Sequence, residues 1–412
     1  MRVAIIGSGV SGLVVAHALH RTHDIAVFEA DARIGGHVHT WHIDTPAGPV
    51  AVDSGFIVFN ERNYPEFTRL IAELGVASQP TNMSFSVRTD RTGLEFNPHS
   101  LRTLFAQPSN ALRPSFLRML ADVLRFHREA PAALRAGMPG LTLGAYLERS
   151  GYSRQFREDY LQPLGSALWS VPRTEVLDMP ATFFVRFFEN HGMLSVNDRP
   201  QWRVIAGGSD NYVRALVAPF RERIRLRTPA YTVTRAANGV QVNGETFDRV
   251  VFACHSDVAL AMLSDATPAE RAVLGALPYQ ENDVVLHTDT SVLPRRRAAW
   301  GAWNYHATRD AGARAALTYN MNILQSLRTP ETYCVTLNGT APIDEARIIG
   351  RVRYHHPRYT LDGFAAQQRR ADISGINGTH FCGAYWGNGF HEDGVASALA
   401  VAREFADAVV SA

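Results

Sequence analysis

A glycine-rich turn near the start of the chain is the segment whose residue types and spacing point most directly to chemistry. Residues 7–12 read G-S-G-V-S-G between a predicted short buried strand, residues 2–6, and an apolar helical stretch. In a strand–turn–helix unit, Gly7 permits the tight turn, Gly9 lets the backbone approach a pyrophosphate and Gly12 lets the helix pack closely. The helix N-terminus adds N–H donors and the positive end of its dipole. The pattern predicts a dinucleotide site whose turn residues are Gly7, Ser8, Gly9, Ser11 and Gly12.

A carboxylate follows the second predicted strand, residues 24–28. Glu29 lies about twenty residues after Gly7, where an acidic side chain accepts hydrogen bonds from the cofactor ribose. Asp31 stands where an enzyme for a 2′-phosphorylated cofactor would place arginine, so the sequence disfavours NADP.

The residues from Glu29 to Thr40, E-A-D-A-R-I-G-G-H-V-H-T, resemble the amine-oxidase-like flavoprotein superfamily. That superfamily includes amine oxidases, phytoene-type desaturases and protoporphyrinogen oxidases. Further similar stretches are residues 52–56, 202–208 and 381–395. The resemblance implies extended FAD, with the N-terminus of a helix expected over residues 396–410 facing the flavin. The cofactor contacts that it implies are Glu29, Ala30, Gly35, Gly36, His37, Gly55, Phe56, Ala230, Gly383, Phe390, His391 and Val395.

Three features depart from the superfamily pattern. His37 replaces the usual arginine after the twin glycine, and Tyr385 stands where glutamate is common. The chain has no lysine, because all 41 basic residues are arginine. It therefore lacks the lysine–water pair with which true amine oxidases assist flavin reoxidation, and amine substrates are disfavoured. No metal is predicted, because strand alternation would set His37 and His39 on the opposite face from His42.

Composition narrows the class of protein. The 412 residues are 46% hydrophobic and carry a formal net charge of +2, which favours a globular protein and gives no basis for nucleic-acid binding. The three cysteines form no C-x-x-C pair, so neither a zinc site nor a dithiol centre is indicated. We found neither a leader nor a membrane span, and we expect a cytoplasmic protein, with peripheral membrane contact as an alternative.

These motifs must be positioned by an α/β fold whose two domains are interleaved in sequence. Asn-Gly pairs at 238–239 and 243–244 separate short β-prone runs, which resemble the superfamily's β-meander. We expect a Rossmann-type FAD-binding domain with this meander, and a mixed α+β substrate domain. The FAD-binding domain is assigned to residues 1–60, 200–255 and 345–412, and the substrate domain to residues 61–199 and 256–344.

Two helical stretches in the substrate domain have alternative interpretations. Residues 100–135 are predicted to be helical and contain six arginines against two acidic residues, which suits either an anionic membrane surface or ordinary one-sided packing. Phenylalanines at 183, 184, 187 and 188 share one helical face and could fill a core or line an acyl tunnel. The substrate wall is expected to contain Phe184, Phe188, Trp303, Tyr305, Tyr319, Trp386 and Phe390, with Phe390 projecting toward the flavin.

The whole chain is also similar to a bacterial branch related to the flavin domain fused to plant cyclopropane fatty acid synthases. That resemblance implies a fatty-acyl or phospholipid substrate, dehydrogenated by hydride transfer to flavin N5. A lipid-modifying methyltransferase is a further possible partner. His391, Glu392 and His306 are the candidate bases. A redox-neutral fatty acyl isomerase, an amine oxidase and a non-catalytic flavoprotein partner of a lipid-modifying enzyme stay open as alternatives.

Overall fold

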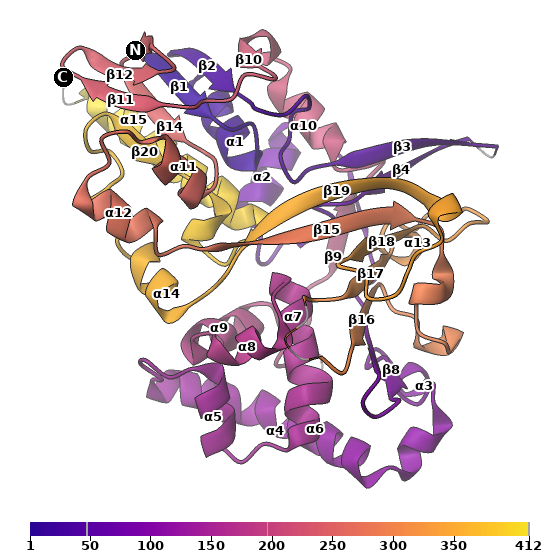
Figure 1. The fold of residues 1–412 in the computed structure, drawn as a ribbon. Coiled ribbons are helices and arrows are strands. Elements are labelled where there is room, and N and C mark those ends of the chain that lie inside the picture. Colours follow the sequence, from indigo (N-terminus) through magenta and orange to yellow (C-terminus); the bar gives the residue numbers. More distant parts are fainter. Residues whose placement is uncertain (47, 196, 311, 313, 411–412) are drawn as a thin grey trace.

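A five-stranded parallel sheet carries the glycine turn. The computed structural model describes residues 1–46, 48–195, 197–310, 312 and 314–410. Its strand order, β10-β2-β1-β14-β20, brings together segments from the start, middle and end of the chain (Figure 1). The strands are β10 (Ile224–Arg225), β2 (Asp24–Phe28), β1 (Arg2–Ile6), β14 (Arg249–Phe252) and β20 (Thr379–Phe381). The bounds predicted for the first two strands of the chain are confirmed.

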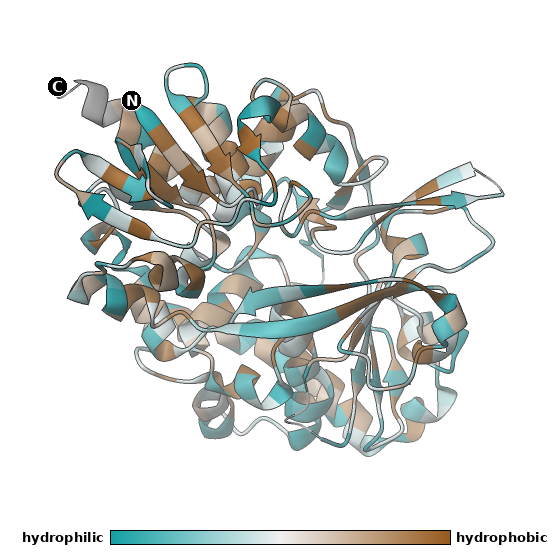
Figure 2. Ribbon diagram, turned by 45° about the horizontal axis from the view of Figure 1, so that its top comes forward, coloured by the Kyte–Doolittle hydropathy of each residue, from teal (hydrophilic) through white to brown (hydrophobic). Residues whose placement is uncertain are grey.

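Both faces of this sheet are buried. Side chains alternate along each strand, so Val3 and Ile5 join one core and Ala4 and Ile6 another. The strands are correspondingly brown in Figure 2, as expected for a parallel sheet covered on both sides. Helices α1 (Val10–Leu19), α2 (Pro65–Glu73), α10 (Asp210–Val217) and α15 (His391–Val410) contribute to the first core.

The second face is covered by a three-stranded antiparallel meander and short helices. The turn between its last two strands is Asn243-Gly244, and both residues have positive φ, 50° and 85°. This is the two-residue hairpin that the Asn-Gly pair predicted. The elements are β11 (Val233–Ala236), β12 (Gly239–Val242), β13 (Glu245–Phe247), α11 (Ser256–Met262), α12 (Pro268–Leu274) and α14 (Leu361–Gln367).

A second large sheet has seven strands and is mostly antiparallel, the β16–β7 pair being parallel. Its long strands β15 and β19 run across the middle of the molecule between the parallel sheet and the helical layer (Figure 1). In order, the strands are β19 (Ile348–Pro357), β15 (Tyr279–His287), β18 (Cys334–Leu337), β17 (Leu317–Asn320), β16 (Trp303–Ala307), β7 (Phe85–Thr89) and β8 (Glu95–Phe96). Small sheets are formed by β3 (Thr40–Thr45) with β4 (Gly48–Asp53), and by β5 (Phe59–Asn60), β9 (Trp202–Ile205) and β6 (Ser78–Pro80).

A helical layer forms the end of the molecule that lies farthest from both termini (Figure 1). The stretch predicted to be helical, residues 100–135, is helical but interrupted: the chain forms α3, a short 3₁₀ segment at 108–112, and α4 beginning at Pro114. Proline is favoured at the first position of a helix, and Pro108 and Pro114 each begin a new segment. Pro131, by contrast, lies inside α4. The layer comprises α3 (Leu101–Leu104), α4 (Pro114–Ala136), α5 (Leu143–Arg149), α6 (Arg154–Phe156), α7 (Gln162–Trp169), α8 (Arg173–Asp178) and α9 (Ala181–Asn190), while α13 (Met321–Leu324) follows β17.

Two stretches pack against a different sheet from the one that the sequence analysis assigned. β19, placed in the FAD-binding segment, pairs along its length with β15 in the seven-stranded sheet. Conversely, α11 and α12 cover the parallel sheet, although residues 256–344 were assigned to the substrate domain. β19 pairs with β15, which lies about seventy positions earlier in the chain, and local sequence does not specify a pairing over such a separation. The mixed α/β class is confirmed. Residues 411 and 412 of the last assigned segment lie outside the described residues.

Candidate functional site

The glycine turn is built for close backbone approach. A Cβ atom at Gly12 would lie 1.9 Å from the Gly7 carbonyl oxygen, so only glycine lets α1 start this near the strand. A Cβ atom at Gly9 would meet nothing within 4 Å. Gly9 is the N-cap of α1 and has no side-chain cap, which leaves the first N–H groups of that helix for a ligand.

Glu29 ties the end of β2 to this turn. Its Oε2 atom accepts hydrogen bonds from the backbone N–H and the hydroxyl of Ser8, at 2.9 and 2.6 Å. Its Oε1 atom accepts the N–H of Asp31 at 2.8 Å. The carboxylate is thus held beside the glycine turn, at the carboxyl edge of the parallel sheet where ligands of such sheets bind. Ala30 follows directly, and the chain leading to Ala230 passes here, because the Thr228 N–H donates to the Glu29 carbonyl.

The twin glycines lie against the same turn. The Gly35 N–H donates to the Ser8 carbonyl at 3.0 Å, and a Cβ atom at Gly36 would lie 3.0 Å from the Gly9 Cα. A Cβ atom at Gly55 would lie 1.8 Å from the His37 carbonyl oxygen, and the Phe56 N–H donates to that oxygen at 2.9 Å. These predicted cofactor contacts therefore form one continuous backbone surface. We call it the glycine surface; it consists of residues 7–12, 35–37 and 55–56.

His37 lies among other rings. It stacks on Tyr354 at 4.7 Å between ring centres, with His356 at 5.4 Å and His255 at 6.2 Å. Burial and the neighbouring imidazoles hold the pKa of His37 well below its usual value. Its Nε2 atom is buried and has no hydrogen-bond partner among the described residues. A neutral ring thus occupies the place where superfamily members carry arginine.

The start of α15 meets the start of α1. A Cβ atom at Gly394 would lie 2.8 Å from Val10 Cγ1 and 3.0 Å from the Ser11 hydroxyl oxygen, so glycine allows the two helices to cross closely. Val395 is buried in the core beside them. Gly383 is held by hydrogen bonds with Ser397, whose hydroxyl accepts the Gly383 N–H at 3.0 Å. Two helix N-termini and their dipoles therefore converge on one region.

Two of the three candidate bases are occupied by structural contacts. The Tyr212 hydroxyl lies 2.5 Å from His391 Nε2, and burial keeps the pKa of Tyr212 well above its usual value, so the tyrosine stays protonated and donates to the imidazole. Both oxygens of Glu392 accept backbone N–H groups at the start of α2, from Glu66 and Phe67 at 3.0 and 2.9 Å. Burial lowers the pKa of His391 to about 3. The predicted base role of these two residues is not supported.

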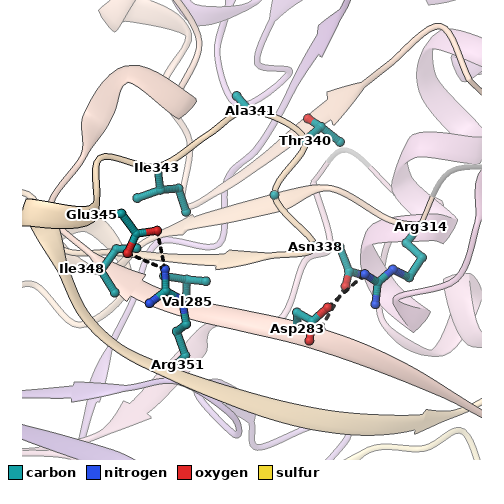
Figure 3. A pocket seen from close by; sticks show the side chains of 11 residues that line it. Asp283, Val285, Arg314, Asn338, Thr340, Ala341, Ile343, Glu345, Ile348 and Arg351 are labelled. Carbon is teal, nitrogen blue, oxygen red and sulfur yellow. Dashed lines mark hydrogen bonds and ion pairs between the residues drawn. The ribbon is translucent and has the colours of Figure 1, made fainter.

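His306, the third candidate, is on β16 in the other sheet. It binds Asp90 at 2.9 Å and Thr340 at 3.0 Å. Thr340 lines a hollow of about 400 Å³ beside β15 and β19 (Figure 3). That hollow is crossed by the ion pairs Asp283–Arg314 and Glu345–Arg351, so its charges are already paired with each other. The structure does not bring His306 to the glycine turn.

The predicted substrate wall is divided among separate cores. Trp303 and Tyr319 meet edge to face at 5.1 Å in the core of the seven-stranded sheet, and the Tyr305 hydroxyl bonds to Ser166. Phe184 and Phe188 stack on each other at 4.3 Å in the helical layer. Trp386 packs beside the meander. The prediction grouped seven residues by their aromatic type alone. In the structure they lie in separate cores and do not form one wall.

Phe390 is the member of that set that joins two cores. It packs against both the core of the parallel sheet and that of the helical layer. Its ring stacks at 5.0 Å on Phe187, which in turn contacts Trp169 at 4.9 Å. We call Phe390, Phe187, Trp169, His191 and Tyr359 the aromatic cluster. Phe187, rather than Phe184 or Phe188, is the residue of α9 that reaches the start of α15.

His191 was missed by the sequence analysis. Its ring stacks on Phe187 at 3.8 Å and lies 6.0 Å from Phe390. Its Nδ1 atom is 2.9 Å from the Phe187 carbonyl oxygen, which can only accept, so Nδ1 carries the hydrogen and the lone pair lies on Nε2. Burial lowers the pKa of His191 to about 4, so the ring is neutral at physiological pH. Its place, one residue after α9, was the available clue.

Tyr359 and Asp393 also escaped notice. A Cβ atom at Gly389 would lie 2.3 Å from the Tyr359 hydroxyl oxygen, which is buried without a partner among the described residues. Asp393 accepts the Phe390 N–H at 2.9 Å, and burial raises its pKa to about 6. Unpartnered buried polar atoms are rare in folded proteins. The Tyr359 hydroxyl, His37 Nε2 and the uncapped start of α1 therefore fit a polar ligand with a phosphate group and ring nitrogens, as FAD has.

Comparison with known proteins agrees with this geometry. Residues 10–315 match the model of the flavin containing amine oxidoreductase family. An L-amino-acid oxidase of Siganus canaliculatus is 21% identical over 328 residues, which cover 70% of this chain and 57% of that protein. The chain thus spans little more than half the length of that relative.

Solved structures show the same fold. A putative protoporphyrinogen oxidase from Exiguobacterium sp. 255-15 superposes with a TM-score of 0.70 at 18% identity, covering 98% of each chain. A fatty acid isomerase from P. acnes that produces CLA superposes with a TM-score of 0.68 at 14% identity, again covering 98% of each chain. The chain belongs to the flavin containing amine oxidoreductase family, a family of FAD-dependent oxidoreductases, and its cofactor is FAD.

Proposed function

We propose that this protein is an FAD-dependent oxidoreductase that dehydrogenates a fatty-acyl chain, free or in a phospholipid. The observation that carries the proposal is the aromatic cluster at the start of α15. It contains phenylalanine, tryptophan and tyrosine rings and one neutral histidine, and it continues into the apolar core of the helical layer. An acyl chain needs apolar lining and no charged anchor, whereas an amino acid needs a group that binds its carboxylate.

The parallel sheet with its glycine turn is, in this proposal, a Rossmann-type FAD-binding unit. The glycine surface and the start of α1 hold the diphosphate, Glu29 binds the ribose, and the start of α15 lies toward the ring system. When bound, FAD supplies the acceptor for the hydride that leaves the acyl chain. The protein's own contribution is to orient the chain and to remove a proton.

His191 is the proposed proton acceptor. Its Nδ1–H is fixed on the Phe187 carbonyl, so the lone pair of the ring lies on Nε2, and the centre of the ring is 6.0 Å from that of Phe390. The neutral ring takes the proton from one carbon while the neighbouring carbon loses its hydride, and a new C=C bond remains. Two electrons and two hydrogens leave the chain, so the step balances. The surrounding rings exclude water and lower the pKa of His191 to about 4, so the imidazole is neutral and its Nε2 atom is able to accept the proton.

Two alternative activities, acyl isomerisation and amine oxidation, are each suggested by a different comparison. The fatty acid isomerase of the same fold suggests a redox-neutral shift of an acyl double bond. The L-amino-acid oxidase relative and the family model suggest oxidation of an amine or amino acid. The absence of lysine from the chain weighs against amine oxidation, because a lysine–water pair is the common device for flavin reoxidation in amine oxidases.

An anaerobic titration separates these activities. The purified yellow protein is mixed with monounsaturated and mid-chain-methylated phospholipids, and the visible flavin absorption is followed while the lipid is analysed by mass spectrometry. Bleaching together with a lipid lighter by two hydrogens is expected for the dehydrogenase. Movement of the double bond without lasting bleaching would identify an isomerase. Bleaching by amino acids or amines, with lipids inert, would overturn the proposal.

A further inference from the structure

Four large apolar side chains are exposed on the helical layer. This layer forms the end of the molecule that lies farthest from both termini (Figure 1). Leu101 is 76% exposed, Leu112 86%, Leu117 46% and Leu124 61%. Among the described residues only ten large hydrophobic side chains are exposed, so nearly half of them fall within one stretch of α3, the 3₁₀ segment and α4. Clustered exposure of this kind marks an interaction surface rather than scattered surface residues.

Arginines accompany these leucines. Arg102 is exposed beside Leu101, and the side chains of Arg118 and Arg128 are 62% and 78% exposed. Between residues 100 and 136 six arginines stand against two acidic residues. One of these, Asp122, is buried, where it accepts the Ser153 N–H at 3.0 Å. The other, Glu129, is bound by Arg125 at 2.9 Å. Arg118 and Arg128 also lie 3.6 and 3.7 Å from Asp122 and Glu129. The positive charge of the exposed surface therefore comes from the excess of six arginines over two acidic residues.

Helix α4 divides these residues between two faces. Its buried side carries Phe116, Met119, Phe126 and Ala130, which pack in the core of the helical layer. Its exposed side carries Leu117, Ala121, Leu124 and Arg128, at intervals of three or four residues. A helix that packs one apolar face inward and presents leucine and arginine outward can lie in the interface of a bilayer, with leucines among the acyl chains and arginines at the headgroups.

The buried side of α4 is continuous with the aromatic cluster. Phe116 and Phe126 belong to the same apolar core as Trp169 and Phe187, and Phe390 packs against that core. Helix α4, which carries two of the exposed leucines, and the residue before α15 are thus both in contact with one apolar core.

We propose that the surface formed by Leu101, Arg102, Leu112, Leu117, Arg118, Leu124 and Arg128, here called the Leu–Arg surface, binds the face of a bilayer that contains anionic phospholipids. Membrane binding by this surface is argued from its charge and its exposed leucines. The further idea that an acyl substrate enters the protein from this side rests on the proposed function. The charge of the surface indicates which partner binds it. A neutral apolar partner would gain nothing from the excess of arginine, whereas a layer of anionic headgroups attracts each arginine near it.

Vesicle flotation with the FAD-loaded protein tests the surface. Vesicles of phosphatidylglycerol mixed with phosphatidylcholine are expected to carry the protein upward, and vesicles of phosphatidylcholine alone are expected to carry much less. High salt should weaken the binding, because it screens charges at the surface. Leu112→Ser and Leu124→Ser are each expected to reduce the bound-to-free ratio about ten-fold, and Arg128→Gln about five-fold.

Tyr231→Ser is the matched control, because Tyr231 is 72% exposed but lies next to the meander, away from α3 and α4. It should float like the parent protein, and all variants should keep their flavin absorption and melting temperature. The proposal of membrane binding would be overturned if the protein floated with neither vesicle type. It would also be overturned if Leu112→Ser and Leu124→Ser floated like the parent protein. Flotation without any change in the lipid or flavin would leave the surface intact and count against the acyl dehydrogenase alone.

Discussion

The glycine surface and the aromatic cluster meet at the start of α15, but they are assembled in different ways. The glycine surface is made by backbone segments that pack on each other because side chains are absent, as at Gly12 and Gly55. The aromatic cluster is made by large side chains from α7, α9, the loop before α14 and the start of α15. Space for a diphosphate is thus created by removing Cβ atoms, whereas the apolar lining is created by filling volume.

This difference predicts different responses to mutation. In the glycine surface, an added Cβ atom should lower stability where two backbone segments touch. Where the backbone instead faces the cofactor, an added Cβ atom should weaken FAD binding and leave stability nearly unchanged. The aromatic cluster should lose stability in proportion to the volume removed.

Phe187→Ala breaks the aromatic cluster and leaves the glycine surface alone. The side chain is 2% exposed and contacts Trp169, His191 and Phe390. Its loss should lower the unfolding free energy by about 4 kcal/mol. Chemical denaturation measures this, and Phe187→Leu is the control, with a loss of about 1 kcal/mol. Equal effects of the two changes would contradict a tightly packed cluster.

Gly12→Ala breaks the glycine surface. The new Cβ would overlap the Gly7 carbonyl oxygen, so the backbone must move, at a cost of about 3 kcal/mol. Gly9→Ala is its partner: nothing lies within 4 Å of that Cβ, so stability should change by less than about 1 kcal/mol while FAD content falls. Flavin absorbance and denaturation report both. Full FAD occupancy in Gly9→Ala would contradict a phosphate site there.

His191→Asn removes the proposed proton acceptor while keeping a donor for the Phe187 carbonyl. Turnover of the acyl substrate should fall about a hundred-fold, with FAD content and flavin spectrum unchanged. His391→Asn is the comparison, since His391 is engaged by Tyr212. A larger loss of turnover in His391→Asn than in His191→Asn, with FAD retained in both, would return the proton-transfer role to His391.

Stability should fall as pH drops from about 6.5 to 4. Burial lowers the pKa of His255 and His356 to about 4, and of His391 to about 3, so the folded state binds fewer protons than the unfolded state in this range. The contribution of these histidines to stability is complete above their pKa in the unfolded state. It is lost as the pH falls toward their lower pKa in the folded state. The buried carboxyl of Asp53, whose pKa is raised to about 6, acts in the opposite direction.

Melting temperatures of the FAD-loaded protein at several pH values test this balance. The histidines outnumber the raised carboxyls, so the melting temperature should decrease with acidification. Asp53→Asn removes an opposing contribution and should make the decrease steeper. A melting temperature that rises between pH 6.5 and 4 would contradict the neutral, buried histidines.

Gly244→Ala should have the smallest effect. Gly244 has φ of 85° in an open hairpin turn, where a Cβ atom would meet nothing within 4 Å. Only the backbone preference is lost, which costs about 1 kcal/mol. FAD content should stay complete, as measured by absorbance, and a loss of cofactor would mean that the meander supports the glycine surface directly.

Local sequence was sufficient where a feature depends on adjacent residues. The first two strands, the glycine turn and the Asn243-Gly244 hairpin follow from glycine geometry and apolar runs, and they have the predicted bounds or turn. The start of α15 was placed five residues too late, because His391, Glu392 and Asp393 look like loop residues until their buried partners are known.

Side-chain roles that depend on partners far away in sequence could not be predicted in the same way. Glu392 resembles a base by type, but two N–H groups from α2 fix its carboxylate. Trp303 and Phe184 are aromatic, but different sheets and helices bury them in separate cores. His191 carries no motif and becomes notable only because Phe187 and Phe390 surround it.

The family and the residues of the glycine surface could be predicted from the sequence, because the absence of a Cβ atom is a property of glycine itself and does not depend on a partner side chain. Only the tertiary structure showed which imidazole lies beside Phe390 and which phenylalanine of α9 reaches the start of α15. Those contacts join segments that only folding brings together.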